Sequence, residues 1–113
     1  MPTTINNNPF PLGVITPGGT TASIAITNNY SDLSTLLVDW VQIRAHPSNS
    51  GFIYLCTTAA APDTSGFANI LDVMGGGGSI VITSTAMNTM PLKNLYIGAS
   101  DATSQAVIMA HVR

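Results

Sequence analysis

Charged side chains are scarce in this sequence of 113 residues. Only 7% of the residues are charged, against about 25% in an ordinary soluble domain, and glutamate is absent altogether. Polarity comes instead from neutral side chains, with fourteen threonines and nine asparagines. One explanation is a small domain that hydroxyls and amides alone keep in solution. We prefer another, in which other subunits cover much of the surface, because charge is costly to desolvate at such contacts.

Basic clusters, cysteine pairs and long apolar runs are also missing. The three cations are dispersed and the net charge is −2, so we expect no nucleic-acid partner. The single Cys56 excludes an intrachain disulfide and is expected to be a small core residue. No apolar run approaches a membrane span, and the first residues lack the basic and apolar regions of a signal peptide. We therefore expect no membrane partner and assembly in a cytoplasm.

Residues that could carry chemistry occur without the patterns that enzymes and metal sites use. His46 and His111 have no carboxylate or thiol at a ligand spacing, and no Gly-x-Ser-x-Gly motif marks a nucleophile. The five aspartates are scattered, most of them in or beside turns. Glycines 75–78 precede a strand pattern, not the Lys and helix of a phosphate loop. We expect no enzymatic activity, no metal and no cofactor.

What the sequence does contain is a series of short β-strand patterns with period-two alternation. The predicted strands are 20–28, 34–47, 51–58, 79–85, 92–99 and 105–113. Segment 67–74 is ambiguous between a strand and a helical turn. The turn formers at 47–51 predict that 34–47 and 51–58 form a hairpin. The predicted fold class is all-β, a single-domain antiparallel β-sandwich or jelly-roll-like barrel, with a simpler meander also open.

Residues 1–19 are predicted to form an extended N-terminal arm ahead of a β domain at 20–113. Four prolines disfavour helix, and the Asn and Gly clusters favour turns. We expect this arm to lie along a neighbouring protein. The side chains expected to bind that partner are the large apolar ones, Ile5, Phe10, Leu12, Val14 and Ile15.

Trp40, Tyr54 and Tyr96 are the remaining candidates for a binding surface. Aromatic side chains bury large areas, so they serve as core residues or as interface anchors. Exposed aromatics also stack on sugar rings. Because only 6% of the residues are aromatic, a dedicated carbohydrate platform is the weaker interpretation.

The middle of the chain contains a passage of recognisable form. In VQIRAHPSNSGFIYL, a strand ending in R-A-x-P precedes an S-N-x-G turn and an apolar strand, and GGGGSIVIT and LKNLYIGASD continue the pattern. This pattern resembles head decoration (capsid cement) proteins and related small virion proteins of tailed bacteriophages. The likeness covers roughly Val41 to Ala110, and it departs from the family pattern at Met74, where Pro-Gly is usual.

This resemblance implies a β-sandwich or jelly-roll-like subunit on the capsid exterior. Such a subunit forms a small cyclic oligomer that bridges major capsid proteins and stabilises the mature shell, and it has no catalytic residues. From the scarcity of charge we expect a homotrimer.

Two other functions fit the same composition. One is a recognition module, in a head fibre or tail tip, that binds a host surface glycan; the other is a structural component of a tail or neck. A glycan site would be concave, with an aromatic floor and a polar rim.

Overall fold

The computed structural model describes residues 9–27, 38–83 and 94–112. Within these ranges the chain forms β-strands and no α-helix. The strands are β1 (Pro9–Ile15), β2 (Ile24–Ala25), β3 (Val38–Ala45), β4 (Ile53–Cys56), β5 (Ile70–Met74), β6 (Ser79–Thr83), β7 (Tyr96–Ala99) and β8 (Ala106–Val112). A helix long and apolar enough to cross a membrane is not found among the described residues.

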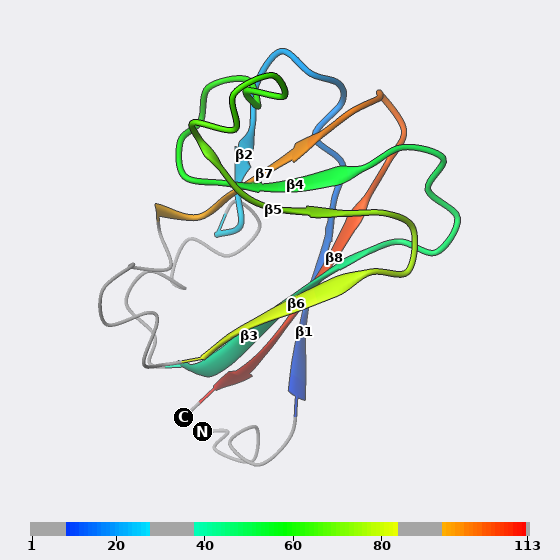
Figure 1. Ribbon diagram of the computed structural model, residues 1–113. Coiled ribbons are helices and arrows are strands. Elements are labelled where there is room, and N and C mark those ends of the chain that lie inside the picture. The colour runs from blue at the N-terminus through cyan, green and yellow to red at the C-terminus, as the bar shows by residue number, and fades with distance from the viewer. Residues whose placement is uncertain (1–8, 28–37, 84–93, 113) are drawn as a thin grey trace.

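The strands make two antiparallel sheets, compatible with the predicted β-sandwich (Figure 1). One sheet has the order β1-β8-β3-β6 and the other β2-β7-β4-β5. Each strand of the first half pairs with its counterpart in the second half, β1 with β8, β2 with β7, β3 with β6 and β4 with β5. The all-β prediction is therefore confirmed.

A single apolar core lies between the sheets. Alternation along β3 turns Val41, Ile43 and Ala45 inward, and β8 contributes Ala106, Ile108 and Ala110 from the neighbouring strand. The facing sheet supplies mainly residues of β4 and β7, such as Leu55 and Ile97. Each large side chain buried in this way contributes about 1.5–3 kcal/mol of hydrophobic stabilisation.

The predicted hairpin between 34–47 and 51–58 is wrong. Strand β3 pairs with β6 and β8, whereas β4 pairs with β5 and β7 in the other sheet. The turn at 46–52 reverses the chain, but it carries the chain from one sheet to the other. Turn-forming residues predict a change of direction and say nothing about which strand becomes the hydrogen-bonded neighbour.

A separate N-terminal arm is not confirmed. Residues 9–15 form β1, which pairs with β8, and Ile15 is only 4% exposed in the core opposite Ala106. The prolines that suggested an arm are equally compatible with an edge strand, where a missing N–H costs no ladder hydrogen bond. Gly13, at a φ of 104°, accompanies a register shift in β1. Ile5 lies outside the described residues.

Two further predicted segments differ from expectation in extent. The expected strand at 20–28 is reduced to the two residues of β2, and Ser23 and Ile26 beside it are buried. The ambiguous segment at 67–74 contains β5, a strand of the second sheet.

Candidate protein-binding face

The outer surface of the β1-β8-β3-β6 sheet is a candidate site. Side chains directly opposite each other on neighbouring strands point to the same side, so the register fixes which residues share this surface. We call it the outer face, and it consists of Val14, Trp40, Gln42, Arg44, Ser79, Val81, Thr83, Val107, Met109 and His111. Each of these residues alternates with a core residue on its strand, so the buried pattern determines the exposed one.

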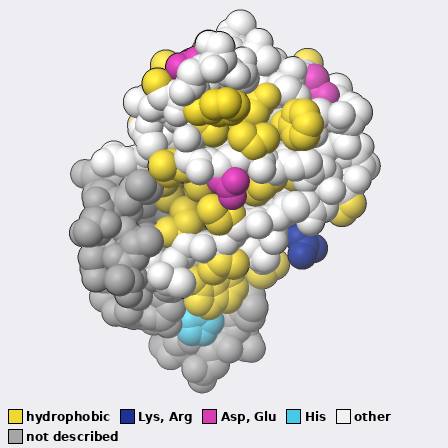
Figure 2. Space-filling model, in the orientation of Figure 1, with side chains coloured by type: hydrophobic (Ala, Val, Ile, Leu, Met, Phe, Trp, Pro, Cys, Tyr) yellow, Lys and Arg dark blue, Asp and Glu magenta, His cyan; other side chains and the backbone are white. Residues whose placement is uncertain are grey.

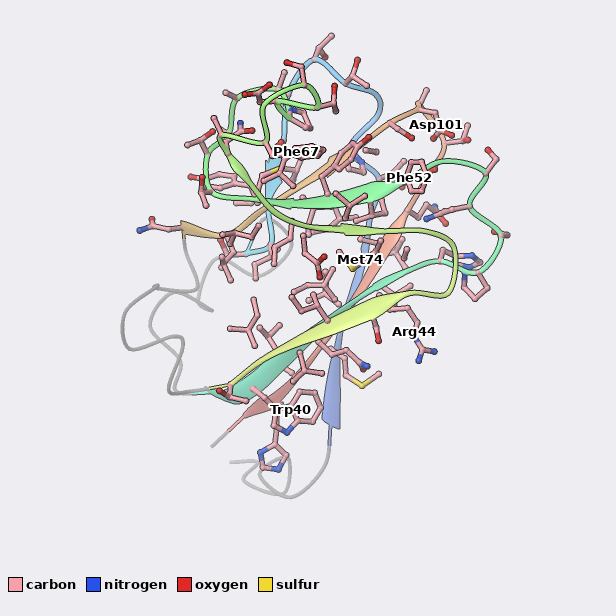
Figure 3. The ribbon with its side chains drawn as sticks, viewed as in Figure 1. Trp40, Arg44, Phe52, Phe67, Met74 and Asp101 are labelled. Atoms are coloured by element: carbon pink, nitrogen blue, oxygen red, sulfur yellow. The ribbon has the colours of Figure 1, made fainter. Side chains whose placement is uncertain are left out.

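A shallow hollow lies on the outer face between β3 and β6. It measures about 220 Å³ and is lined by Trp40, Gln42, Val81 and Thr83. Trp40 is half-buried and stacks on His111 of β8, with ring centroids 6.0 Å apart and ring planes 21° from parallel. The stack holds the indole in place beside the hollow, and Figure 3 shows Trp40 at the opposite end of the molecule from Phe67.

The outer face carries little charge. Arg44 is the one permanently charged side chain on it among the described residues, and it lies opposite Ser79 and Val107 at one end (Figure 3). Val81 is 50% exposed and Val14 is 45% exposed. On the side that Figure 2 presents, hydrophobic side chains are exposed over both sheets, and Lys or Arg is scarce. Such a surface suits a neutral contact with another protein.

Comparisons with known protein families, with curated proteins and with solved structures find no match. The geometry of the outer face is therefore the basis for inferring what it binds.

The outer surface of the other sheet is covered in part by the β4–β5 loop, residues 57–69, while Leu71 and Val73 of β5 stay 46% and 39% exposed. Ser23 joins β2 to this loop: its N–H donates to the carbonyl of Ala59 and its hydroxyl to the carbonyl of Ala60, each at 3.0 Å. Pro62 packs so closely over Gly98 that a methyl group on Gly98 would collide with its ring. This loop leaves less of that sheet open to a partner.

The loop also has its own internal hydrogen bonds. The Asp63 carboxylate accepts from the N–H of Gly66 at 3.0 Å and from that of Ala68 at 3.3 Å, and these bonds hold the pKa of Asp63 below its ordinary value. The Asn69 side chain accepts from the N–H of Asp63 at 2.8 Å. Phe67 adopts a positive φ of 57° within this loop and is exposed.

The three aromatic candidates are not brought together. Trp40 lies on the outer face, whereas Tyr54 and Tyr96 belong to β4 and β7 of the other sheet. Tyr54 is only 7% exposed and Tyr96 is half-buried, whereas Trp40 lines the hollow on the outer face.

Of the residues assigned to the arm, Val14 and Ile15 have described side chains. Val14 points to the outer face and Ile15 into the core, as alternation along β1 requires. Phe10 and Leu12 lie within β1.

Cys56 is fully buried, as its sequence context predicted. Its thiol donates to the carbonyl of Tyr54 at 3.8 Å. Burial raises the pKa of the thiol, and hydrogen bonds with Ser23 and the backbone of Gly98 offset part of the rise. A buried thiol with a raised pKa is a poor nucleophile.

The remaining ionisable groups form no metal site in the part of the chain that the structure describes, since no three His, Cys or Asp side chains gather there. The Asp101 carboxylate accepts within its own loop from the N–H of Ser104 at 2.7 Å and from that of Thr103 at 3.2 Å, and it also accepts from the Ser50 hydroxyl at 3.3 Å. Hydrogen bonding to Ser104, first from its side chain and then from its backbone, lowers the pKa of Asp101. No local pattern indicates that Trp40 stacks on His111, since β3 and β8 lie far apart in the chain.

Proposed function

We propose that this chain is a structural virion protein that binds the exterior of a tailed-phage capsid and stabilises the mature shell by bridging major capsid proteins. The observation that carries the proposal is the outer face, a broad and nearly uncharged sheet surface with exposed valines and a half-buried tryptophan. Contact surfaces between proteins are depleted in charge and enriched in aromatic residues and methionine at their centres.

The strand order gives independent support. The strands pair first with last, second with seventh, third with sixth and fourth with fifth. The chain is therefore arranged as one long hairpin that is wound into two sheets. Eight strands joined as two Greek keys in this manner constitute a jelly roll, an architecture used by viral capsid proteins and by lectins. We infer a jelly roll for this chain.

The physical task also suits such a subunit. A shell filled with DNA is stabilised by any protein that binds its expanded form and not its immature or disassembled form, through mass action. This task requires a rigid scaffold and a large contact area, and no catalytic group.

A binding assay on capsid shells tests the proposal. Shells depleted of this chain are prepared in immature and expanded forms from the virus that encodes it, and the purified protein is added to each. We expect saturable co-sedimentation with expanded shells only, together with a higher temperature of shell disruption. Binding to neither form would contradict the proposal.

A matched pair of variants locates the contact. Trp40→Ala should weaken binding by at least about tenfold, because a central aromatic anchor contributes about 2 kcal/mol or more. Phe52→Ala removes an aromatic side chain that is 51% exposed in the β3–β4 connection and should leave binding unchanged.

One observation favours a second candidate, the recognition of a host glycan. The hollow combines an indole with the Gln42 amide and the Thr83 hydroxyl, groups that contact sugar rings in binding sites. Its walls are nevertheless mostly apolar, which favours an apolar side chain of a protein partner. Binding to an immobilised glycan that Trp40→Ala abolishes, without any binding to shells, would support this second function instead.

A further inference from the structure

Strand β6 is the one sheet edge, among the described strands, that lacks the usual protection. Edge strands expose unpaired N–H and C=O groups, and proteins blunt them with Pro, bulges, charges, short length or a covering loop. Edge β1 carries Pro9, Pro11 and a register shift. Edge β2 has two residues, and the β4–β5 loop bridges to it through Ala22 and Ala60.

Edge β5 is protected as well. It contains Asp72, whose carboxylate accepts from the N–H of Val73 at 2.8 Å, and its register with β4 shifts between Leu55 and Cys56. Edge β6 has none of these devices within residues 9–27, 38–83 and 94–112, the part of the chain that the structure describes. Its sequence, Ser-Ile-Val-Ile-Thr, has no Pro or charge, and its register with β3 runs without a shift. Figure 1 shows β6 at the margin of its sheet, in the foreground.

The backbone groups that β6 leaves unpaired can be assigned. The N–H of Ala45 donates to the carbonyl of Gly78 at 2.8 Å, one step beyond the pair of Arg44 and Ser79. Antiparallel ladders alternate between pairs that exchange hydrogen bonds and pairs that do not. Ile80 and Ile82 therefore direct their N–H and C=O groups to β3. Ser79, Val81 and Thr83 direct theirs to the open edge.

The side chains of β6 form a nearly palindromic pattern. Around a two-fold axis at Val81, an antiparallel copy of β6 places Ser79 opposite Thr83, Ile80 opposite Ile82 and Val81 opposite Val81. Hydroxyl then faces hydroxyl on the outer face, and isoleucine faces isoleucine on the core side. Cross-strand pairs of these kinds stabilise antiparallel sheets.

We propose that β6 pairs with β6 of a second copy of this chain, antiparallel about an axis at Val81, to join the two β1-β8-β3-β6 sheets into one continuous sheet. The outward N–H and C=O groups of Ser79, Val81 and Thr83 form hydrogen bonds with the same backbone groups of the second copy. A second copy, not an unrelated strand, is the occupant because the pattern is complementary to itself, as a two-fold contact requires. The two outer faces become one surface, and the pairing gives a dimer in place of the expected trimer.

The inference does not rest on the proposed function. Its test uses the isolated protein, whereas the proposed function is tested on shells, so either can fail alone.

Light scattering after size exclusion tests the stoichiometry. At micromolar concentration we expect a mass of twice 11.7 kDa. Val81→Lys places two like charges opposite each other at the axis and should weaken the dimer by at least about tenfold. Phe52→Lys adds the same charge at a side chain of equal exposure, away from the axis, and should remain a dimer. A mass of three times 11.7 kDa, or a monomer at millimolar concentration, overturns the proposal.

Hydrogen exchange tests the register without a mutation. The amides of Ile80 and Ile82 should be protected at every protein concentration, because β3 accepts their hydrogen bonds. Those of Ser79, Val81 and Thr83 should lose protection on dilution. Val81→Pro removes an N–H that points away from β3. The variant should therefore be folded by circular dichroism and monomeric by light scattering. A dimer in which the amides of Ser79, Val81 and Thr83 exchange freely uses another surface and contradicts the proposal.

Discussion

At the scale of single residues, Gly98 is where the smallest change should have a large effect. A Cβ atom at this position would collide with the ring of Pro62 and lie 3.0 Å from the Ser23 hydroxyl. Gly98 is buried beside β4 and beneath the β4–β5 loop, which contains Pro62 and is hydrogen-bonded to Ser23. Neither Pro62 nor Ser23 can therefore move away without opening the loop. We expect Gly98→Ala to lower the free energy of unfolding by about 1–3 kcal/mol, the usual cost of overpacking, measured by urea denaturation.

A double-mutant cycle identifies the cause of that loss. Pro62→Ala removes the ring atoms that the new methyl group would meet, so the double variant should be more stable than the sum of the two single effects predicts. Strictly additive effects would mean that the collision with Pro62 is not responsible.

Residue-scale prediction from the sequence succeeded where local pattern is sufficient. The inward positions of Val41, Ile43 and Ala45 follow from alternation alone, and Cys56 was expected in the core. Tyr54 shows the limit. It was a candidate for an interface, but it is buried, and nothing in its own strand reveals which surface of that strand the rest of the chain leaves open.

At the scale of elements, two connections depend on each other. The Asn49 side chain donates to the carbonyl of Gln105 at 2.8 Å and accepts from the N–H of the same residue at 2.9 Å. The Ser50 hydroxyl donates to Asp101 at 3.3 Å, and the N–H of Phe52 donates to the Ser100 hydroxyl at 2.8 Å. The β3–β4 and β7–β8 connections are thus cross-linked at one end of the sandwich (Figure 3).

Asp101 makes this cross-link sensitive to acid. Its pKa is lower in the folded protein than the ordinary 3.8, so its contribution to stability is present above that value and is lost as the pH falls through the folded pKa. We expect Asp101→Asn to lower the urea midpoint at neutral pH. The difference between the two proteins should shrink as the pH falls below about 4. An undiminished difference at low pH would assign the effect to something other than the charge.

Element-scale prediction found most strands but none of their partners, since the one predicted pairing, between 34–47 and 51–58, is wrong. Alternation in 79–85, 92–99 and 105–113 was sufficient to find β6, β7 and β8, because side-chain period reports which face is buried. It does not report which strand lies alongside. The pairing of β3 with β8, which creates the stack of Trp40 on His111, joins segments separated by almost two-thirds of the chain, and no local signal encodes it.

At the scale of the whole molecule, the composition and the structure both bear on which surfaces other proteins cover. A surface with few charges is expected where other proteins cover it, and the outer face and the edge of β6 are both uncharged over most of their extent. The two surfaces are adjacent, since Val81 and Thr83 belong to both. A dimer through β6 would therefore present the two hollows side by side to one partner.

The character of this contact leads to a prediction about salt. If charge held the protein to a shell, affinity would fall steeply as the Debye length shortens from about 10 Å at 0.1 M salt to about 3 Å at 1 M. On the outer face only Arg44 offers a permanent charge among the described residues, and an exposed pair contributes about 0–1 kcal/mol. Apolar burial contributes about 25 cal/mol per Å², so the hydrophobic term should dominate even after the costs of association.

We therefore expect occupancy on expanded shells to remain nearly unchanged in 1 M NaCl and to be lost in urea. Arg44→Ala should alter binding by less than about threefold, because an exposed pair contributes under 1 kcal/mol, and this variant should show the same flat salt dependence as the wild type. Trp40→Ala supplies the contrast, since it should weaken binding at every salt concentration. Light scattering on each variant would separate a loss of shell binding from a loss of the dimer. Release of the folded protein by salt alone would mean that a few charged contacts dominate, and the apolar outer face would then not be the surface that holds the shell.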